Sequence, residues 1–244
     1  MAQRSSTNIA IGSPLTLWWT RFSDLEFNPS TRHLSEDELF RYECLRGEAQ
    51  HYFSQSRLLM KSVIASYLNI PFSEIGFVMN RYGKPSLKHN PYLIEFNISH
   101  SKDYWAMIIS EHHAVGIDLE FVDERLDYRA IMHTFFTETE IELGISNSAI
   151  VGKTQDQARA DFFKIWVAKE AFTKAQGLGL SAFNQALPLA EYLAHGYATS
   201  DLKGVPYIIQ SIDLLPELKL AVCVFHTKQI QIQLRAVNQQ IPIL

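Results

Sequence analysis

Apolar and polar positions alternate most clearly in a short segment near the middle of the chain, residues 114–120. In a strand, successive side chains point to opposite faces, so Ile117 and Leu119 share one face while Asp118 and Glu120 share the other. Two carboxylates held this close repel each other, and burying either is costly without a counter-charge. A divalent cation bound by oxygen ligands, Mg²⁺ before Mn²⁺ or Ca²⁺, would resolve the repulsion. An edge strand with two solvated acids is the alternative interpretation.

In residues 161–174, apolar side chains recur at the spacing of an amphipathic helix. At about 100° per residue, Glu170 falls between Phe163 and Trp166 inside the apolar stripe, and Lys174 lies one turn later on the same side. An ordinary ion pair at the rim of the stripe, contributing a few tenths of a kcal/mol, is one interpretation. The other is a third metal-binding carboxylate followed by a cation directed at an anionic substrate.

The pattern along the rest of the chain predicts an α/β (α+β) fold in which each half has helices and a small, mostly antiparallel sheet. Its natural boundary lies at residues 111–113, which gives halves 1–112 and 113–244. Residues 146–157 are polar without a period and predict a loop, and residues 188–203 give no readable pattern. Strands are predicted at residues 15–20, 77–79, 92–98, 104–110, 112–122, 206–214, 219–226 and 229–236. Helices are predicted at residues 48–68, 129–136 and 159–176, and after the capping boxes at 35–38 and 137–140.

Composition narrows the class of protein. With 244 residues, of which 47% are hydrophobic and 20% charged, the chain is an ordinary globular protein. A net charge of −4 argues against a general nucleic-acid binder. Cys44 and Cys223 belong to no Cys-x-x-Cys pair, so we expect two free, buried thiols in a reducing compartment. Residues 1–13 lack a signal-peptide pattern and no apolar run approaches membrane-spanning length, so we expect a cytoplasmic protein with no membrane partner.

Four short motifs occur in a characteristic order. They are Gly83-Lys84-Pro85, Asn97-Ile98-Ser99-His100-Ser101, Gly116-Ile117-Asp118-Leu119-Glu120, and the segment from Trp166 to Lys174 that contains Lys169-Glu170-Ala171. With Arg57 on the preceding helix, this ordered set resembles the 4′-phosphopantetheinyl transferase superfamily, and its Sfp type in particular. The resemblance covers residues 57–174; beyond about residue 180 only the general strand character is similar.

The resemblance implies a pseudo-twofold pair of α/β subdomains with the active site in the cleft between them. Enzymes of this kind transfer the 4′-phosphopantetheine arm of coenzyme A to a serine of an apo acyl or peptidyl carrier protein and release 3′,5′-ADP. It further implies a Mg²⁺-dependent enzyme, with Mn²⁺ as a possible substitute, that acts as a monomer in fatty acid or secondary metabolite biosynthesis. The carrier protein itself is not specified by the sequence.

The resemblance also assigns roles to residues. Asp118, Glu120 and Glu170 would bind the metal, and Lys174 would face the pyrophosphate. Glu170, or a water held by the metal, would take the proton of the acceptor serine. Lys174 would stabilise the leaving group, and His100 would donate to a phosphate oxygen.

Coenzyme A would bind through residues of the same motifs, with Arg57 at the nucleotide end. Arg41 would reach the 3′-phosphate from the preceding helix. Taken alone, His100 is more typical of a solvated loop and Lys84 of a turn, and only the ordered set favours a functional role. The expected coenzyme A-binding residues are Arg57, Gly83, Lys84, Pro85, Ser99, His100 and Lys174.

Two other functions compete with this one. A metal-dependent nuclease also combines acids with a lysine, but that class places the acid and lysine two residues apart on a strand. Here Glu170 and Lys174 are four apart on a helix. The second alternative is a non-catalytic module that binds coenzyme A or a carrier protein. Every acid of the set is retained, so the sequence shows no sign of such decay.

Overall fold

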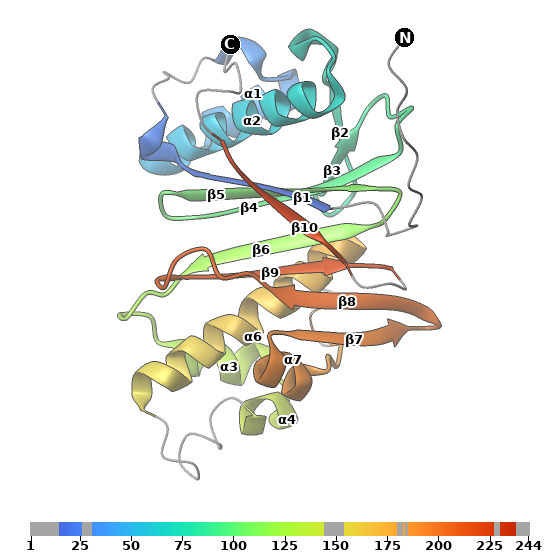
Figure 1. Ribbon diagram of the computed structural model, residues 1–244. Coiled ribbons are helices and arrows are strands. Elements are labelled where there is room, and N and C mark those ends of the chain that lie inside the picture. The colour runs from blue at the N-terminus through green and yellow to red at the C-terminus, as the bar shows by residue number, and fades with distance from the viewer. Residues whose placement is uncertain are drawn as a thin grey trace.

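The structure is a computed structural model that describes residues 15–25, 31–143, 154–179, 183, 185–226 and 230–237. Two four-stranded sheets face each other, and each carries one long helix on its outer face (Figure 1). The prediction of an α/β fold built from helices and small, mostly antiparallel sheets in two halves is confirmed.

The first sheet has the order β10-β1-β5-β4 and the second the order β6-β9-β8-β7. Their strands are β1 (Leu15–Arg21), β4 (Ile94–Ser101), β5 (Tyr104–Glu111), β6 (Val115–Phe121), β7 (Tyr197–Leu202), β8 (Val205–Ser211), β9 (Leu218–Val224) and β10 (Ile232–Ala236). A separate hairpin consists of β2 (Phe77–Met79) and β3 (Pro85–Leu87). The α-helices are α1 (Glu36–Cys44), α2 (Gly47–Leu68), α3 (Tyr128–Phe135), α4 (Glu138–Ile141), α6 (Gln155–Gln176) and α7 (Leu189–His195).

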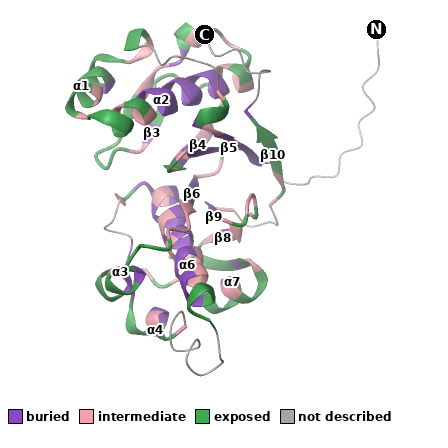
Figure 2. Cartoon of the chain, turned by 90° about the vertical axis from the view of Figure 1, so that its left-hand side faces the viewer, coloured by how far each residue is buried: buried purple, intermediate pink, exposed green. Residues whose placement is uncertain are grey.

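Three apolar cores hold these layers together. The middle core lies between the sheets and includes Leu17 of β1, Ile108 of β5 and Ile117 of β6. The two outer cores join α2 to the first sheet and α6 to the second, and they include Trp105 and Phe172. Figure 2 shows buried residues along α2 and α6, whereas α1 and α3 are largely exposed. The long helices are therefore the elements fixed most firmly against the sheets.

The structure differs from the predicted elements in several places. Strand β4 continues through Ser101, so the motif that begins at Asn97 is part of the strand and not its exit. The unreadable stretch forms α7 and β7, and α6 begins at Gln155, before the predicted start. Cys44 is exposed, so the prediction that it is buried was wrong, whereas Cys223 is buried as predicted. Cys44 is the last residue of α1, a helix in which most residues are exposed.

Strand β10 comes from the end of the chain but pairs in parallel with β1, in the sheet that belongs mainly to the first half. A boundary near residue 112 stays a prediction. Within the part of the chain that the structure describes, no helix combines the length and the apolar character needed to cross a membrane.

Candidate active site

Helix α6 lies unusually close to strand β6 at Gly116. A Cβ atom on this residue would lie 2.1 Å from the carbonyl oxygen of Ala171 and 2.4 Å from the backbone nitrogen of Ala175. Such distances are far below van der Waals contact, so only glycine permits this approach. The glycine two positions before Asp118 therefore brings the helix that carries Glu170 and Lys174 against the strand that carries the acids.

Strands β4 and β6 belong to different sheets, but a row of side-chain hydrogen bonds joins their edges. Ser99 Oγ donates to Asp118 Oδ1 at 2.8 Å, and Ser101 Oγ donates to Glu120 Oε2 at 2.7 Å. Asn97 Oδ1 accepts a hydrogen bond from a backbone N–H of β6 at 2.9 Å. The alternation predicted for residues 114–120 thus places the acids of β6 opposite the polar residues of β4.

The ammonium of Lys174 completes this cluster. Its Nζ lies 2.5 Å from Asp118 Oδ1 and 3.1 Å from Ser99 Oγ. Glu170, one turn earlier, is partly buried, and burial together with the negative charge of Asp118 raises its pKa. The same two causes raise the pKa of Glu120 to about 7. The three carboxylates therefore interact unfavourably, as the sequence predicts.

The donor set suits a hard divalent cation, because it consists of carboxylate oxygens whose mutual repulsion a cation would relieve. Asp118 Oδ2 is buried and has no hydrogen-bond partner among the described residues, which leaves it available as a ligand. Across the described part of the chain, however, no three His, Cys, Asp or Glu side chains are already arranged around a common metal position. The carboxylate oxygens are the kind of ligand that such an ion prefers, but the side chains would have to move toward a common position to bind it.

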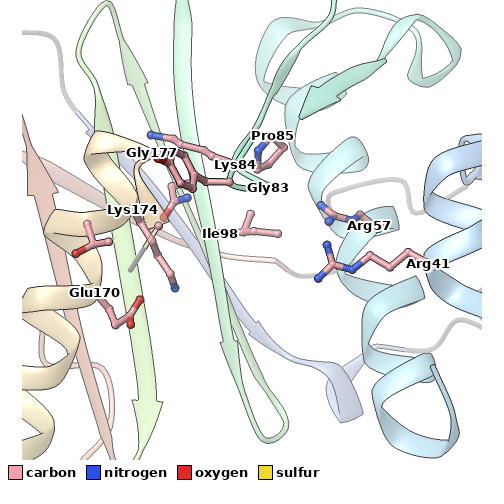
Figure 3. Close-up of a pocket in the computed structure, with 13 residues that line it drawn as sticks. Arg41, Arg57, Gly83, Lys84, Pro85, Ile98, Glu170, Lys174 and Gly177 are labelled. Atoms are coloured by element: carbon pink, nitrogen blue, oxygen red, sulfur yellow. The ribbon is translucent and has the colours of Figure 1, made fainter. Parts of the chain in front are cut away.

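A cavity of about 310 Å³ lies next to this cluster, between the two halves of the chain. Arg41 and Arg57 line one side, and Glu170 and Lys174 line the other (Figure 3). The loop that contains Gly83 forms part of its wall. The structure therefore brings together, around one cavity, most of the residues that the motifs single out.

Arg57 is held by residues that sequence reasoning missed. Its Nε lies 3.6 Å from Glu38 Oε1, and both side chains are almost fully buried. Lys61 Nζ lies 3.7 Å from the other oxygen of Glu38. The Arg57 and Arg41 guanidinium groups both lie over the ring of Phe53, at 5.0 Å and 5.7 Å from its centroid. The capping box of α1 identified Glu38 by its helix-capping role, and nothing in the sequence indicated its second role toward Arg57.

His100 lies on the other face of β4 from Ser99. Its ring packs edge-on with the ring of Phe22, with 6.4 Å between the ring centroids. Partial burial and the positive charges of Lys174 and Arg57 lower its pKa. An imidazole in this electropositive setting is a natural neighbour for an anion.

Lys84 and Pro85 occupy the wall of the cavity, but the ammonium of Lys84 is engaged elsewhere. Its Nζ donates to the carbonyl oxygens of Val115 and Ala175, each at 3.1 Å. Burial lowers its pKa. The expected contact of this lysine with a coenzyme phosphate stays a prediction.

A second cavity, of about 290 Å³, is lined in part by Glu120 and Ser101. Its lining is mainly apolar and includes Leu126, Phe162 and Trp166. On the same helix as Phe162 and Trp166, Lys169 forms a buried ion pair with Glu140, with Nζ–O distances of 2.6 Å and 2.8 Å. Sequence reasoning recorded Lys169 only as part of the motif, although a lysine on the buried face of a helix is itself a signal for a buried partner.

Comparison with known proteins agrees with the site. The sequence model described as the 4′-phosphopantetheinyl transferase superfamily matches residues 114–200, and that described as 4′-phosphopantetheinyl transferase, N-terminal, matches residues 26–113. The chain is 31% identical over 195 residues to the 4′-phosphopantetheinyl transferase Sfp of Bacillus subtilis, an alignment that covers 76% of this chain and 80% of Sfp.

Two further relatives share shorter segments. The 4′-phosphopantetheinyl transferase gsp of Aneurinibacillus migulanus is 37% identical over 123 residues, 50% of this chain and 47% of gsp, so the chain spans about half the length of that relative. The L-aminoadipate-semialdehyde dehydrogenase-phosphopantetheinyl transferase of Xenopus laevis is 34% identical over 134 residues, 51% of this chain and 42% of that protein. As its motifs predict, the chain belongs to the 4′-phosphopantetheinyl transferase superfamily of enzymes, which includes the Sfp type.

Proposed function

We propose that this chain transfers the 4′-phosphopantetheine group of coenzyme A to a serine of an apo acyl or peptidyl carrier protein and releases 3′,5′-ADP. The observation that carries the proposal is the cluster of Asp118, Glu120, Glu170 and Lys174, which lies beside a cavity that is lined on its far side by two arginines. Family membership supports the same reaction.

The charges around the cavity suit coenzyme A, which carries a pyrophosphate and a 3′-phosphate. Arg57 and Arg41 offer guanidinium groups on one side of the cavity, and Lys174 offers an ammonium on the other. Guanidinium groups bind phosphates through paired hydrogen bonds, and an ammonium acts as a point charge. In the proposed complex, the 3′-phosphate lies toward Arg57 and Arg41, and the pyrophosphate lies toward Lys174. His100, Ser99 and the loop 83–85 would complete the binding site.

We propose that Asp118, Glu120 and Glu170 bind Mg²⁺, with Mn²⁺ as a substitute. The fit rests on Oδ2 of Asp118, which is buried and has no hydrogen-bond partner within the described part of the chain, and on the raised pKa values of the two glutamates. When bound, the ion would neutralise the charge of the pyrophosphate. A cation bound to Asp118 would share this carboxylate with the ammonium of Lys174.

The chain's own residues would handle the proton and the developing charge. The serine oxygen forms a bond to the phosphorus that carries the pantetheine arm, and the bond from that phosphorus to 3′,5′-ADP breaks. Glu170 would accept the serine proton. Lys174 would stabilise the negative charge that the leaving phosphate gains. The apolar cavity beside Glu120 suits the uncharged pantetheine arm.

We further propose a monomeric enzyme in the cytoplasm. One chain supplies both sides of the cavity, so a partner subunit is not needed to complete it. Cys44 and Cys223 are both free, which suits a reducing compartment.

Intact-mass analysis of apo carrier proteins incubated with the chain, coenzyme A and Mg²⁺ tests the proposal. A mass increase equal to one phosphopantetheine group, on at least one acyl or peptidyl carrier, is the expected result. Tight coenzyme A binding, measured by calorimetry, without any mass increase would support the non-catalytic binding module. Absence of both would contradict the proposal.

A further inference from the structure

The ammonium of Lys84 joins three segments that are distant in the sequence. Lys84 immediately precedes β3 in the hairpin loop, Val115 begins β6, and Ala175 lies in the last turn of α6. Nζ is 3.1 Å from the carbonyl oxygen of Val115 and 3.1 Å from that of Ala175. Because these two carbonyl oxygens belong to the second half of the chain and Lys84 to the first, one side chain bridges the halves.

The carbonyl of Ala175 is a natural acceptor for a cation. The last four carbonyl groups of a helix have no partner within the helix, and their dipoles attract positive charge. Figure 3 shows the Lys84 side chain directed away from Arg41 and Arg57, on the side of the cavity where Gly177 and Lys174 lie. The ammonium is thus directed at the end of α6 and not at the positively charged wall of the cavity.

Asn80 makes a second, uncharged contact between the same loop and the same helix end. Its Nδ2 donates to the carbonyl oxygen of Gly177 at 2.8 Å. Its Oδ1 accepts from the backbone nitrogens of Tyr82 and Lys84 at 2.9 Å and 3.0 Å, which fixes the loop around it. Asn80 therefore holds Lys84 in place and ties the loop to α6.

Two glycines after α6 leave room for this loop. Gly177 has a left-handed φ of 66° and ends the helix, and a Cβ atom on it would lie 3.2 Å from Cδ of Lys84. A Cβ atom on Gly179 would lie 3.2 Å from the ring of Tyr82. The segment from Gly177 to Gly179, which follows the last residue of α6, therefore allows the hairpin loop to pack closely against the helix end.

We propose that Lys84 is a positioning residue that, with Asn80, latches the hairpin loop onto the end of α6 and the start of β6. Ala175 follows Lys174 directly, and Val115 lies three residues before Asp118. The latch therefore anchors both sides of the Lys174–Asp118 contact. The inference rests on the proposed function only for its kinetic test, because the contacts themselves involve no substrate.

Hydrogen exchange of the substrate-free protein tests the latch directly. Lys84→Met keeps the apolar stem and removes the donors, and Asn80→Ala removes the second contact. Each change is expected to speed amide exchange in the last turn of α6 about tenfold, since a hydrogen bond to a charged group is lost in the first case. The double variant should add little to either single change. Arg81→Met, in the same loop but with its side chain exposed over Tyr82, is the matched control and should change nothing.

Steady-state kinetics then separates a latch from a phosphate ligand. A latch predicts that Lys84→Met and Asn80→Ala change kcat and the KM for coenzyme A to a similar extent, because both variants free the same loop. Unchanged exchange in Lys84→Met, with a raised KM for coenzyme A that Asn80→Ala does not share, would overturn the proposal. If the natural chain transferred no phosphopantetheine, the exchange experiment would still decide on the latch by itself.

Discussion

The ammonium of Lys174 lies 2.5 Å from Oδ1 of Asp118, although 56 positions separate the two residues in the sequence. Ser99 donates to the same oxygen at 2.8 Å. Strand β4, strand β6 and helix α6 therefore meet at a single carboxylate oxygen. The arrangement depends on Gly116, which lets the helix approach the strand.

Gly116→Ala tests that dependence. The added Cβ would overlap the backbone of α6 at Ala171 and Ala175, and backbone atoms cannot move aside as a flexible side chain can. We expect a loss of about 3 kcal/mol in the free energy of unfolding, measured by denaturant titration, and loss of activity. Gly76→Ala is the control, because its Cβ would meet Lys88 at an ordinary 3.6 Å. Equal stability of the two variants would contradict the account of the close approach.

Glu38→Gln tests how Arg57 is held. The change leaves two buried cations, on Arg57 and Lys61, without their counter-charge. We expect a loss of about 3 kcal/mol in stability and weaker coenzyme A binding by calorimetry. Ser35→Ala removes only the capping interaction of the same helix and should cost about 1 kcal/mol without affecting the coenzyme. If both variants bound coenzyme A equally well, Glu38 would be only a helix-capping residue.

Because Lys169 and Glu140 form a buried ion pair, we expect that the stability losses caused by single substitutions at these two positions do not add in the double variant. Lys169→Met alone leaves a buried carboxylate unpaired and should cost about 3–5 kcal/mol. Glu140→Gln in the same chain removes that unpaired charge and should recover part of the loss. A double variant as unstable as the sum of the two single variants would show that the pair is not coupled.

The lowered pKa of His100 predicts that the folded protein loses stability at acidic pH. Because burial and the charges of Lys174 and Arg57 lower its pKa in the folded state, the unfolded chain takes up the proton first as the pH falls. The folded protein therefore loses stability as the pH falls below about 6.5. Denaturant titration at pH 7.5 and 5.5 should show a smaller loss for His100→Gln than for the natural chain. If the variant and the natural chain lost the same stability between these two pH values, groups other than His100 would be responsible for the loss.

Much of the site could be predicted because it lies on regular elements. The alternation around Asp118 and the helical period around Glu170 each determine a face, and the structure places both faces as the periods predict. Strand β4 was predicted too short because its polar residues at Ser99 and Ser101 resemble a turn. They lie in a strand because their hydroxyl groups find carboxylates on β6.

Long-range contacts could not be predicted in this way. No local pattern indicates that β10 crosses to pair with β1, or that Lys84 reaches the end of α6. Glu38 was missed because its capping box already explains a glutamate at that position. In each of these cases the role of the residue or strand depends on a tertiary contact, and a single sequence does not show which distant residues are in contact.

In the proposed reaction, Asp118 and its neighbours form the transfer site. The most direct measurement is the rate of phosphopantetheine transfer to an apo carrier protein by Asp118→Asn, followed by intact mass. Asp201→Asn, an exposed acid in β7 remote from the cluster, is the matched control. We predict a loss of about 100-fold or more for Asp118→Asn and a normal rate for the control. Transfer by Asp118→Asn at the rate of the natural chain would contradict the account.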